Sequence, residues 1–454
     1  MSIENVRTVY FIGIGGIGMS ALARYFRHLG CEVYGYDRTK TDLTRALEAE
    51  GMHIHYEEDI SQIPSAVDLV VWTPAVPTTH RELVWLREHG HTILKRAQVL
   101  GLISQTKRCI AVAGTHGKTT TTSLIAWLLH STGTDVTAFL GGIAANFESN
   151  FILGHSDWVV VEADEYDRSF LQLEPEIAVI NSLDPDHLDV YGTPQAVVEA
   201  YWNFARRVKP GGMLYYRADL PLRHVVEDLR QRGCQVATFG VEDGECQAIN
   251  FRRDNGCMAF DISMRGALYE GMRLPMPGRH NIENALAAWL AAFAAGAPEQ
   301  EMKRTMPLFR GVKRRFEVVL HLPELVYIDD YAHHPAEIRA TITAARLFFP
   351  NKKVTGIFQP HLFSRTRDFA DEFAAALDLL DTCYLLPIYP AREEPIAGVS
   401  SELIFRNMAI PDKYLVSKED LLERLRARRP EMLLTMGAGD IDTLVKLIAQ
   451  QLKP

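Results

Sequence analysis

Short runs of apolar residues recur along almost the whole chain and alternate with longer helical patterns. In the first hundred residues these runs are V-Y-F-I-G-I at 9–14, E-V-Y-G-Y-D at 32–37 and L-V-V-W-T at 69–73. Strands that alternate with helices pair in parallel, because each connection crosses back over the sheet. The alternation therefore predicts an α/β fold built on parallel sheets.

Two further series of the same kind follow the first. The candidate strands are 109–113, 158–161 and 177–180 in the second series, and 326–328, 354–358, 383–386 and 432–435 in the third. Between them, 249–276 reads as shorter strands with turns near 254–256, and 281–295 as an alanine-rich helix. A chain of 454 residues is too long for one core of ordinary size. We predict three domains at 1–105, 106–312 and 313–454.

The charge balance excludes some classes of partner. The chain is 47% hydrophobic and 23% charged, with a formal net charge of -9. Such a chain can bury sizeable cores but lacks the broad positive potential that coats nucleic acid or an anionic membrane. We expect neither as a partner.

The sequence also indicates a cytoplasmic protein. The N-terminal residues lead directly into a strand, without a basic segment followed by an apolar one, and no run approaches ~20 apolar residues. Six cysteines are scattered without C-x-x-C spacing, which is typical of reduced thiols.

A glycine-rich loop, G-T-H-G-K-T at 114–119, lies between a predicted strand and a predicted helix. Its glycines are closer together than in the usual phosphate-binding loop, but the context is that of backbone amides around phosphate oxygens. Lys118 would supply a charge to the phosphates and Thr119 a hydroxyl to Mg²⁺. The alternative is a plain turn with a solvated lysine. The candidate ATP-binding residues here are Gly114, Thr115, His116, Gly117, Lys118, Thr119 and Thr120.

Acidic residues follow two of the predicted strands. Glu162 ends the run at 158–161, where a carboxylate can meet a metal held by Thr119. His187, in D-P-D-H-L-D at 184–189, is a candidate ligand of a second divalent ion. Alone, Glu162 is equally compatible with a solvated strand end, and the aspartates of 184–189 are more typical of a turn or a helix N-cap.

Together, six motifs resemble the Mur ligase family, the ATP-dependent amide-bond-forming enzymes of peptidoglycan precursor synthesis. They are G-T-H-G-K-T-T-T at 114–121, E-A-D-E at 162–165, D-H-L-D at 186–189, G-R-H-N-I-E-N-A at 278–285, R-R-F-E at 314–317 and D-D-Y-A-H-H-P at 329–335. Two more stretches, G-I-G-G-I-G-M at 13–19 and F-Q-P-H-L-F-S-R-T-R at 358–367, most resemble the member that adds the first amino acid.

The resemblance implies a fold and a reaction. The fold would have an N-terminal Rossmann-like domain for a UDP-sugar, a central P-loop ATPase-like parallel sheet, and a C-terminal Rossmann-like domain for the amino acid. The reaction would join L-alanine to the lactyl carboxylate of UDP-N-acetylmuramate through an acyl phosphate, with ATP and Mg²⁺. It implies small-molecule partners, and we expect a monomer or weak homodimer. A related ligase, such as a murein tripeptide ligase or a folylpolyglutamate synthetase, and a nucleotide-dependent switch remain alternatives.

The resemblance also assigns roles to residues. Lys118, Thr119, Glu162 and His187 would hold phosphate and two Mg²⁺ ions. The nucleotide would further contact His280, Asn281, Asn284, Arg315 and Asp330. The amino acid would contact Tyr331, His333, His361 and Arg365, with His333 as a candidate base. Leu362 stands where many relatives carry arginine, and 194–208 contains no lysine, so we predict no carbamylated lysine.

The N-terminal glycines admit two interpretations. Gly13, Gly15, Gly16, Ile17 and Gly18 follow a strand, and Asp37 ends the next one, which satisfies the dinucleotide-binding fingerprint. This pattern alone suggests an NAD-dependent dehydrogenase. UDP, however, has the same diphosphate, ribose and base, and the resemblance favours UDP-sugar binding at these six residues.

Overall fold

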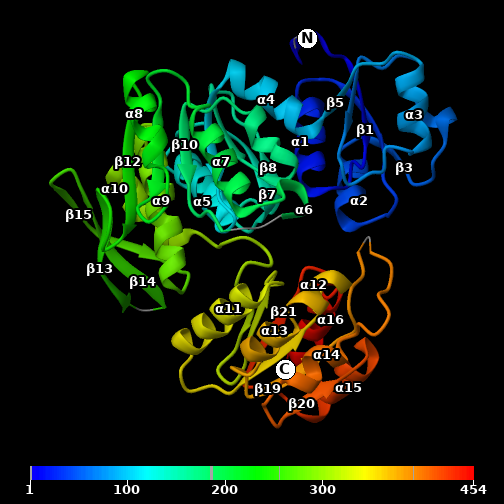
Figure 1. The fold of residues 1–454 in the computed structure, drawn as a ribbon, viewed down its shortest axis with the longest axis vertical. Coiled ribbons are helices and arrows are strands. Elements are labelled where there is room, and N and C mark those ends of the chain that lie inside the picture. Colours follow the sequence, from blue (N-terminus) through cyan, green and yellow to red (C-terminus); the bar gives the residue numbers. More distant parts are fainter. Residues whose placement is uncertain (1–2, 185–187, 255, 392, 454) are drawn as a thin grey trace. The chain divides into compact units, whose positions relative to one another are not determined.

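A computed structural model of the chain describes residues 3–184, 188–254, 256–391 and 393–453 (Figure 1). It contains three sheets, each flanked by helices, and most strand pairs are parallel. The predicted α/β class is therefore confirmed. The chain separates into two compact units, one mainly of residues up to Arg310 and one mainly of Gly311–Pro454. The boundaries at 105 and 312 stay predictions.

The first sheet has the strand order β3-β2-β1-β4-β5 and is parallel throughout. The order reverses between β1 and β4, and at such a point the carboxyl ends of the strands leave a crevice for a ligand. Its elements are η1 (Ile3–Asn5), β1 (Thr8–Ile12), α1 (Ile17–His28), β2 (Glu32–Tyr36), α2 (Asp42–Ala49), β3 (His53–His55), η2 (Ile60–Gln62), β4 (Leu69–Trp72), α3 (Arg81–Glu88), β5 (Ile93–Lys95) and α4 (Arg96–Thr106).

The second sheet has ten strands, ordered β15-β14-β13-β12-β11-β10-β6-β9-β7-β8. β6 lies in parallel between β10 and β9, and β7 and β8 form an antiparallel edge. Its strands are β6 (Arg108–Ala113), β7 (Thr137–Ala144), β8 (Ser149–Ile152), β9 (Trp158–Glu162), β10 (Ile177–Ile180), β11 (Met213–Arg217), β12 (Gln235–Val241), β13 (Cys246–Asp254), β14 (Cys257–Met264) and β15 (Ala267–Leu274).

The helices of this sheet explain why β6 reads as a continuous apolar run. Cys109–Ala113 are buried, as expected for a strand that is covered on both faces. α5 and α9 pack against each other, and α9 is buried along most of its length. The helical elements are α5 (Lys118–Ser131), η3 (Tyr166–Gln172), α6 (Leu188–Tyr191), α7 (Pro194–Ala205), α8 (Arg223–Gln231), α9 (Arg279–Ala294), α10 (Glu299–Thr305) and η4 (Met306–Leu308).

The third sheet is ordered β16-β17-β21-β18-β19-β20, and only the β16–β17 pair is antiparallel. Side chains of α11, α13 and α14 cover one face, and those of α15 and α16 cover the other. Its elements are β16 (Glu317–His321), β17 (Val326–Asp330), α11 (Pro335–Phe348), β18 (Val354–Phe358), α12 (Phe363–Asp368), α13 (Ala370–Leu377), β19 (Thr382–Leu385), α14 (Glu402–Asn407), β20 (Lys413–Leu415), α15 (Lys418–Ala427), β21 (Met432–Met436) and α16 (Asp442–Leu452).

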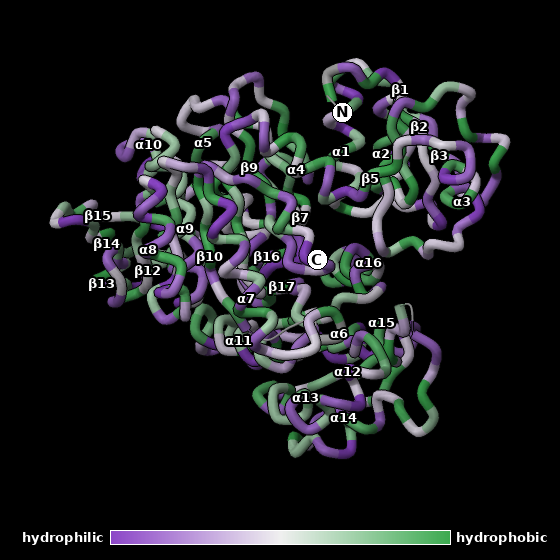
Figure 2. Tube along the Cα trace, turned by 45° about the horizontal axis from the view of Figure 1, so that its top comes forward, coloured by the Kyte–Doolittle hydropathy of each residue, from purple (hydrophilic) through white to green (hydrophobic). Residues whose placement is uncertain are grey.

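The surface helices mix apolar and polar residues, as Figure 2 shows for α11 and α16. One side of each such helix packs on a sheet and the other faces solvent. Among the residues that the structure describes, none of the helices combines the length and apolarity that a membrane crossing requires.

A carboxyl group of α3, that of Glu82, is buried against the first sheet. Glu82 accepts hydrogen bonds from the Tyr10 hydroxyl at 2.7 Å and from the Asp59 amide at 2.8 Å, and its Oε1 lies 3.1 Å from His55 Nε2. Burial raises the pKa of Glu82 above its ordinary value of 4.5, although the two hydrogen bonds oppose the shift. The folded chain therefore holds this proton more tightly than the unfolded chain does.

This shift predicts a pH dependence of stability. A raised pKa in the folded state means that the contribution of Glu82 to stability is lost as the pH rises from 4.5 through the folded pKa. We expect the melting temperature of Glu82→Gln, relative to that of the unaltered chain, to rise over this range. Thermal melts at a series of pH values measure the difference, and a difference that is flat with pH would contradict the assignment.

Candidate functional site

The glycine-rich loop at 114–117 connects β6 to α5, as the sequence predicts. Gly114 and Gly117 have φ of +140° and +81°, which residues with a side chain rarely adopt. A Cβ on Gly117 would also lie 2.3 Å from Asn284 Oδ1, and one on Gly114 2.9 Å from the Ser182 amide nitrogen. The shortened loop thus requires glycine at both positions.

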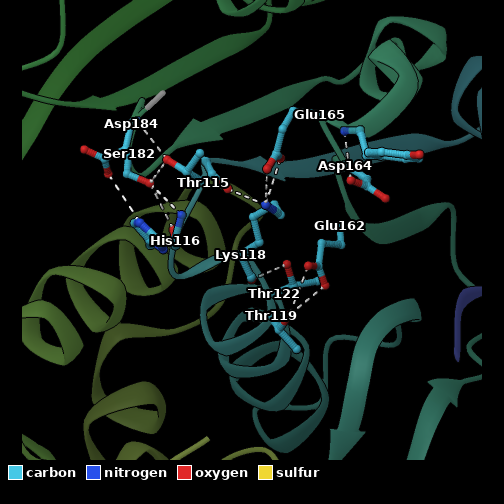
Figure 3. A network of polar contacts seen from close by, with 12 residues as sticks. Thr115, His116, Lys118, Thr119, Thr122, Glu162, Asp164, Glu165, Ser182 and Asp184 are labelled. Atoms are coloured by element: carbon cyan, nitrogen blue, oxygen red, sulfur yellow. Dashed lines mark hydrogen bonds and ion pairs between the residues drawn. The ribbon is translucent and has the colours of Figure 1, made fainter. Parts of the chain in front are cut away.

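Ser182, just beyond β10, holds the loop from the side. Its Oγ accepts a hydrogen bond from the His116 amide at 2.7 Å and lies 3.1 Å from Thr115 Oγ1 (Figure 3). Thr115 Oγ1 in turn accepts from the Asp184 amide at 2.9 Å. These contacts hold the backbone of the loop in place.

Lys118 begins α5, and its ammonium group is already engaged. Nζ donates to the Gly114 carbonyl at 2.6 Å and to the Glu165 carboxylate at 2.9 and 2.8 Å (Figure 3). Burial lowers the pKa of Lys118, but nearby Glu165, Glu162 and Asp164 outweigh it, and the pKa lies above its ordinary value. The lysine is therefore charged and held beside the loop.

Thr119 and Glu162 meet at the carboxyl edge of the second sheet. Thr119 Oγ1 donates to Glu162 Oε1 at 2.9 Å and lies 3.0 Å from Oε2 (Figure 3). The carboxylate packs against Gly141 of β7, where a Cβ would lie 1.8 Å from Glu162 Oε2. A hydroxyl and a carboxylate in contact are oxygen donors of the kind that Mg²⁺ prefers. His187, the other predicted metal ligand, lies outside the described residues.

The predicted adenine contacts lie on the first turns of α9. Asn281 and Asn284 are buried, and His280 is exposed. Asn284 Oδ1 accepts from Thr121 Oγ1 at 3.3 Å and from Asn181 Nδ2 at 3.4 Å. Asn284 thus ties α9 to α5 and to the end of β10, beside the loop.

The predicted amino-acid contacts gather in the second compact unit, around the end of β17. The Tyr331 ring has the guanidinium carbons of Arg314 and Arg315 at 5.0 and 5.1 Å from its centroid. His333 stands 5.2 Å from the Tyr331 ring and 6.0 Å from the His361 ring, centroid to centroid. Asp330 accepts from the Phe316 and Ala332 amides at 2.7 and 2.8 Å.

Two groups of this cluster suit a zwitterionic ligand. Arg365 Nη1 is buried with no hydrogen-bond partner among the described residues. Burial lowers the pKa of His333, and Arg365 and Arg315 act in the same direction, whereas Glu337 opposes them. The cluster therefore offers a guanidinium for a carboxylate and a neutral imidazole for a proton. Leu362, which stands where the sequence resemblance leads us to expect an arginine, has φ +72° at the start of α12.

The glycine loop of the first sheet closes on its own acidic residue. Gly13 has φ +87°, and the Gly15 amide donates to Asp37 Oδ2 at 2.8 Å. A Cβ on Gly15 would lie 2.8 Å from that same oxygen. Gly16 then caps α1, which begins at Ile17. Asp37, which was predicted to bind the UDP-sugar together with this loop, thus accepts a hydrogen bond from the loop itself.

Comparison with known proteins decides the family. Three family models match the chain, described as "Mur ligase family, catalytic domain" at residues 8–108, "Mur ligase middle domain" at 112–292 and "Mur ligase, glutamate ligase domain" at 314–439. The UDP-N-acetylmuramate–L-alanine ligase of Cytophaga hutchinsonii is 46% identical over 464 residues, 99% of this chain and 98% of that protein. The chain belongs to the Mur ligase family.

Other proteins similar to this Mur ligase belong to the same group of ligases. The UDP-N-acetylmuramate–L-alanine ligase of Parabacteroides distasonis is 48% identical over 457 residues, 99% of this chain and 98% of that protein. The solved UDP-N-acetylmuramate–alanine ligase of Thermotoga maritima matches with a TM-score of 0.84 and 30% identity over 98% of both chains. A murein peptide ligase from Psychrobacter arcticus, at TM-score 0.72 and 24% identity over 98% of both chains, shares the fold.

The structure adds to the Mur ligase site residues that received no individual role from the sequence. Glu165 and Ser182 hold Lys118 and the loop, and Gly141 gives room to Glu162. Ser182 follows a predicted strand, and this position could have marked it as a candidate site residue. Nothing in the sequence marked Gly141, because its importance depends on the packing of β7 beside β9, which leaves room for Glu162 only where a side chain is missing.

Proposed function

We propose that this Mur ligase joins L-alanine to the lactyl carboxylate of UDP-N-acetylmuramate and converts ATP to ADP and phosphate. The family is ATP-dependent. The observation that carries the proposal is the meeting of Lys118, Thr119 and Glu162 at one sheet edge, in a chain similar over nearly its whole length to ligases of that name.

The first step activates the carboxylate. A carboxylate is a poor acyl donor because its leaving group would be oxide. Transfer of the γ-phosphoryl group to a carboxylate oxygen gives an acyl phosphate and ADP. Lys118 and the amides of 114–117 would bind the phosphate oxygens during this transfer. Thr119 and Glu162 would hold Mg²⁺, which neutralises phosphate charge when bound.

The second step forms the amide. The neutral amine of alanine attacks the acyl carbon, and the tetrahedral intermediate expels phosphate. Arg365 would bind the alanine carboxylate, and His333 would accept a proton from the ammonium group, since its lowered pKa leaves a neutral imidazole near pH 7. Tyr331 and His361 would line the same site.

The decisive experiment is an assay of phosphate release with UDP-N-acetylmuramate, ATP and Mg²⁺ and a panel of amine donors. We expect release with L-alanine that exceeds release with glycine or serine. Release with a peptide or glutamate but not with alanine would instead indicate a murein tripeptide ligase or a folylpolyglutamate synthetase.

We also propose a cytoplasmic monomer or weak homodimer, and sedimentation tests the oligomeric state.

Replacing Arg365 with lysine tests the amino-acid site. Lysine keeps the charge but loses the two-pronged hydrogen bonding of the guanidinium, so we expect the KM for alanine to rise tens of fold, equivalent to about 2 kcal/mol. Arg367→Lys is the matched control, because Arg367 lies on the same helix and pairs with exposed Asp368 at 2.7 Å. An unchanged KM for alanine in the Arg365 variant would remove this residue from the site.

A further inference from the structure

Arg96, the first residue of α4, contacts the start of α1 and the segment after β9, which belong to two different sheets. Its guanidinium lies against Gly18 in the first turn of α1, where a Cβ would be 2.7 Å from Nη1 and 3.2 Å from Cζ. On its other side, Nη2 donates to Asp164 Oδ2 at 3.1 Å. Asp164 follows β9, two residues after Glu162. The guanidinium therefore lies between the first turn of α1 and the Asp164 carboxylate.

The surroundings of Arg96 suit an anion. The first turn of a helix carries partial positive charge on its free amides, which repels a cation placed beside it. The Asp164 side chain offsets this repulsion but is 37% exposed, and an ion pair so open to water contributes little stability. A diphosphate at the glycine loop would accept hydrogen bonds from both the amides and the guanidinium. A guanidinium can donate two parallel hydrogen bonds to one phosphate group.

A small cavity beside Arg96 also borders Glu162 of the proposed phosphate-transfer site. It is lined by Arg96 and Leu100 of α4, by Glu162 and Asp164, and by Phe170 of η3. The sugar of a nucleotide-sugar held at the glycine loop has to bring its carboxylate toward Glu162. Arg96 touches the start of α1 and also lines the cavity that Glu162 borders.

We propose that Arg96 binds the diphosphate of UDP-N-acetylmuramate, and that Asp164 is the counter-ion that holds the guanidinium until this substrate arrives. The inference rests on the proposed function, because it takes UDP-N-acetylmuramate as the ligand of the glycine loop. Substrate and Asp164 compete for one guanidinium, so the two residues affect affinity in opposite directions.

Titration calorimetry on the full chain tests the proposal with UDP-N-acetylmuramate, UDP and UMP. We expect Arg96→Gln to weaken binding of the first two ligands about 10- to 100-fold and to reduce the preference for UDP over UMP. Arg96→Lys keeps a point charge and recovers part of the affinity. We expect Asp164→Asn to tighten binding of UDP, because the carboxylate no longer competes for the guanidinium. Thermal melts check that each variant is folded.

Lys95→Gln is the matched control. Lys95, at the end of β5, joins neighbouring segments of the same two sheets through an ion pair with Asp167 of η3 at 2.6 Å, so its loss measures the effect of breaking such a link alone. We expect it to leave UDP affinity unchanged. Equal weakening by Arg96→Gln and Asp164→Asn would show a purely structural ion pair, and unchanged affinity in Arg96→Gln would overturn the proposal.

The outcome also separates this inference from the proposed function. If the unaltered chain neither binds UDP-N-acetylmuramate nor releases phosphate with alanine, the proposed function fails. If it does both while Arg96→Gln binds UDP as tightly as the unaltered chain, only the role of Arg96 fails.

Discussion

Replacing Lys118 with methionine is expected to lower the rate of ADP formation at least about 100- to 1,000-fold, because the charge that would offset the transferred phosphate is lost. Methionine fills a similar volume, so the loop keeps its packing. Affinity for UDP-N-acetylmuramate should stay nearly constant, since the glycine loop belongs to the first sheet. ADP formation is measured by a coupled assay, and sugar-nucleotide affinity by titration calorimetry.

The same change removes the Lys118 ammonium group from beside the buried Glu165 carboxylate. Breaking a buried ion pair from one side costs about 3–5 kcal/mol, so the single variant is expected to melt at a lower temperature. The double variant Lys118→Met with Glu165→Gln should regain most of that stability but none of the turnover. If turnover returned with stability, the lysine would serve the fold alone. An equal loss of sugar-nucleotide affinity would contradict the assignment of the two ligands to separate sheets.

Local sequence patterns were sufficient for most of the fold. The run at 32–37 is β2, the shorter strands at 249–276 are β13, β14 and β15, and the alanine-rich segment at 281–295 is α9. Each pattern reports an environment that a strand or helix experiences along its own length. β7 was not recognised, because the glycines at 141 and 142 interrupt its apolar run.

The candidate site was predicted less completely, because its contacts join distant parts of the chain. The loop at 114–119 could be recognised, since strand, glycines, lysine and threonine are contiguous. That Glu165 is the partner of Lys118 depends on how β9 lies beside β6. Asp37 was expected to face a ligand, yet it accepts the Gly15 amide, a contact made possible by the pairing of β1 with β2.

Gly141→Ala is expected to lower ATP turnover about 100-fold, although Gly141 carries no chemical group. The added Cβ would lie 1.8 Å from Glu162 Oε2 and 2.6 Å from its Cδ, a separation that no packing tolerates. The carboxylate then has to leave the Thr119 hydroxyl, and one of the two proposed Mg²⁺ donors is lost. We expect the Mg²⁺ concentration for half-maximal turnover to rise, as it should in Glu162→Gln.

A double-mutant cycle decides whether Gly141 acts through Glu162. Once the carboxylate is replaced by an amide, displacing that side chain removes nothing further, so Gly141→Ala should reduce turnover of Glu162→Gln by less than about twofold. Independent effects would multiply instead and leave the double variant far slower than either single one. That result would mean that the alanine disturbs the edge formed by β7 and β8, and that the space beside Glu162 is not what Gly141 provides.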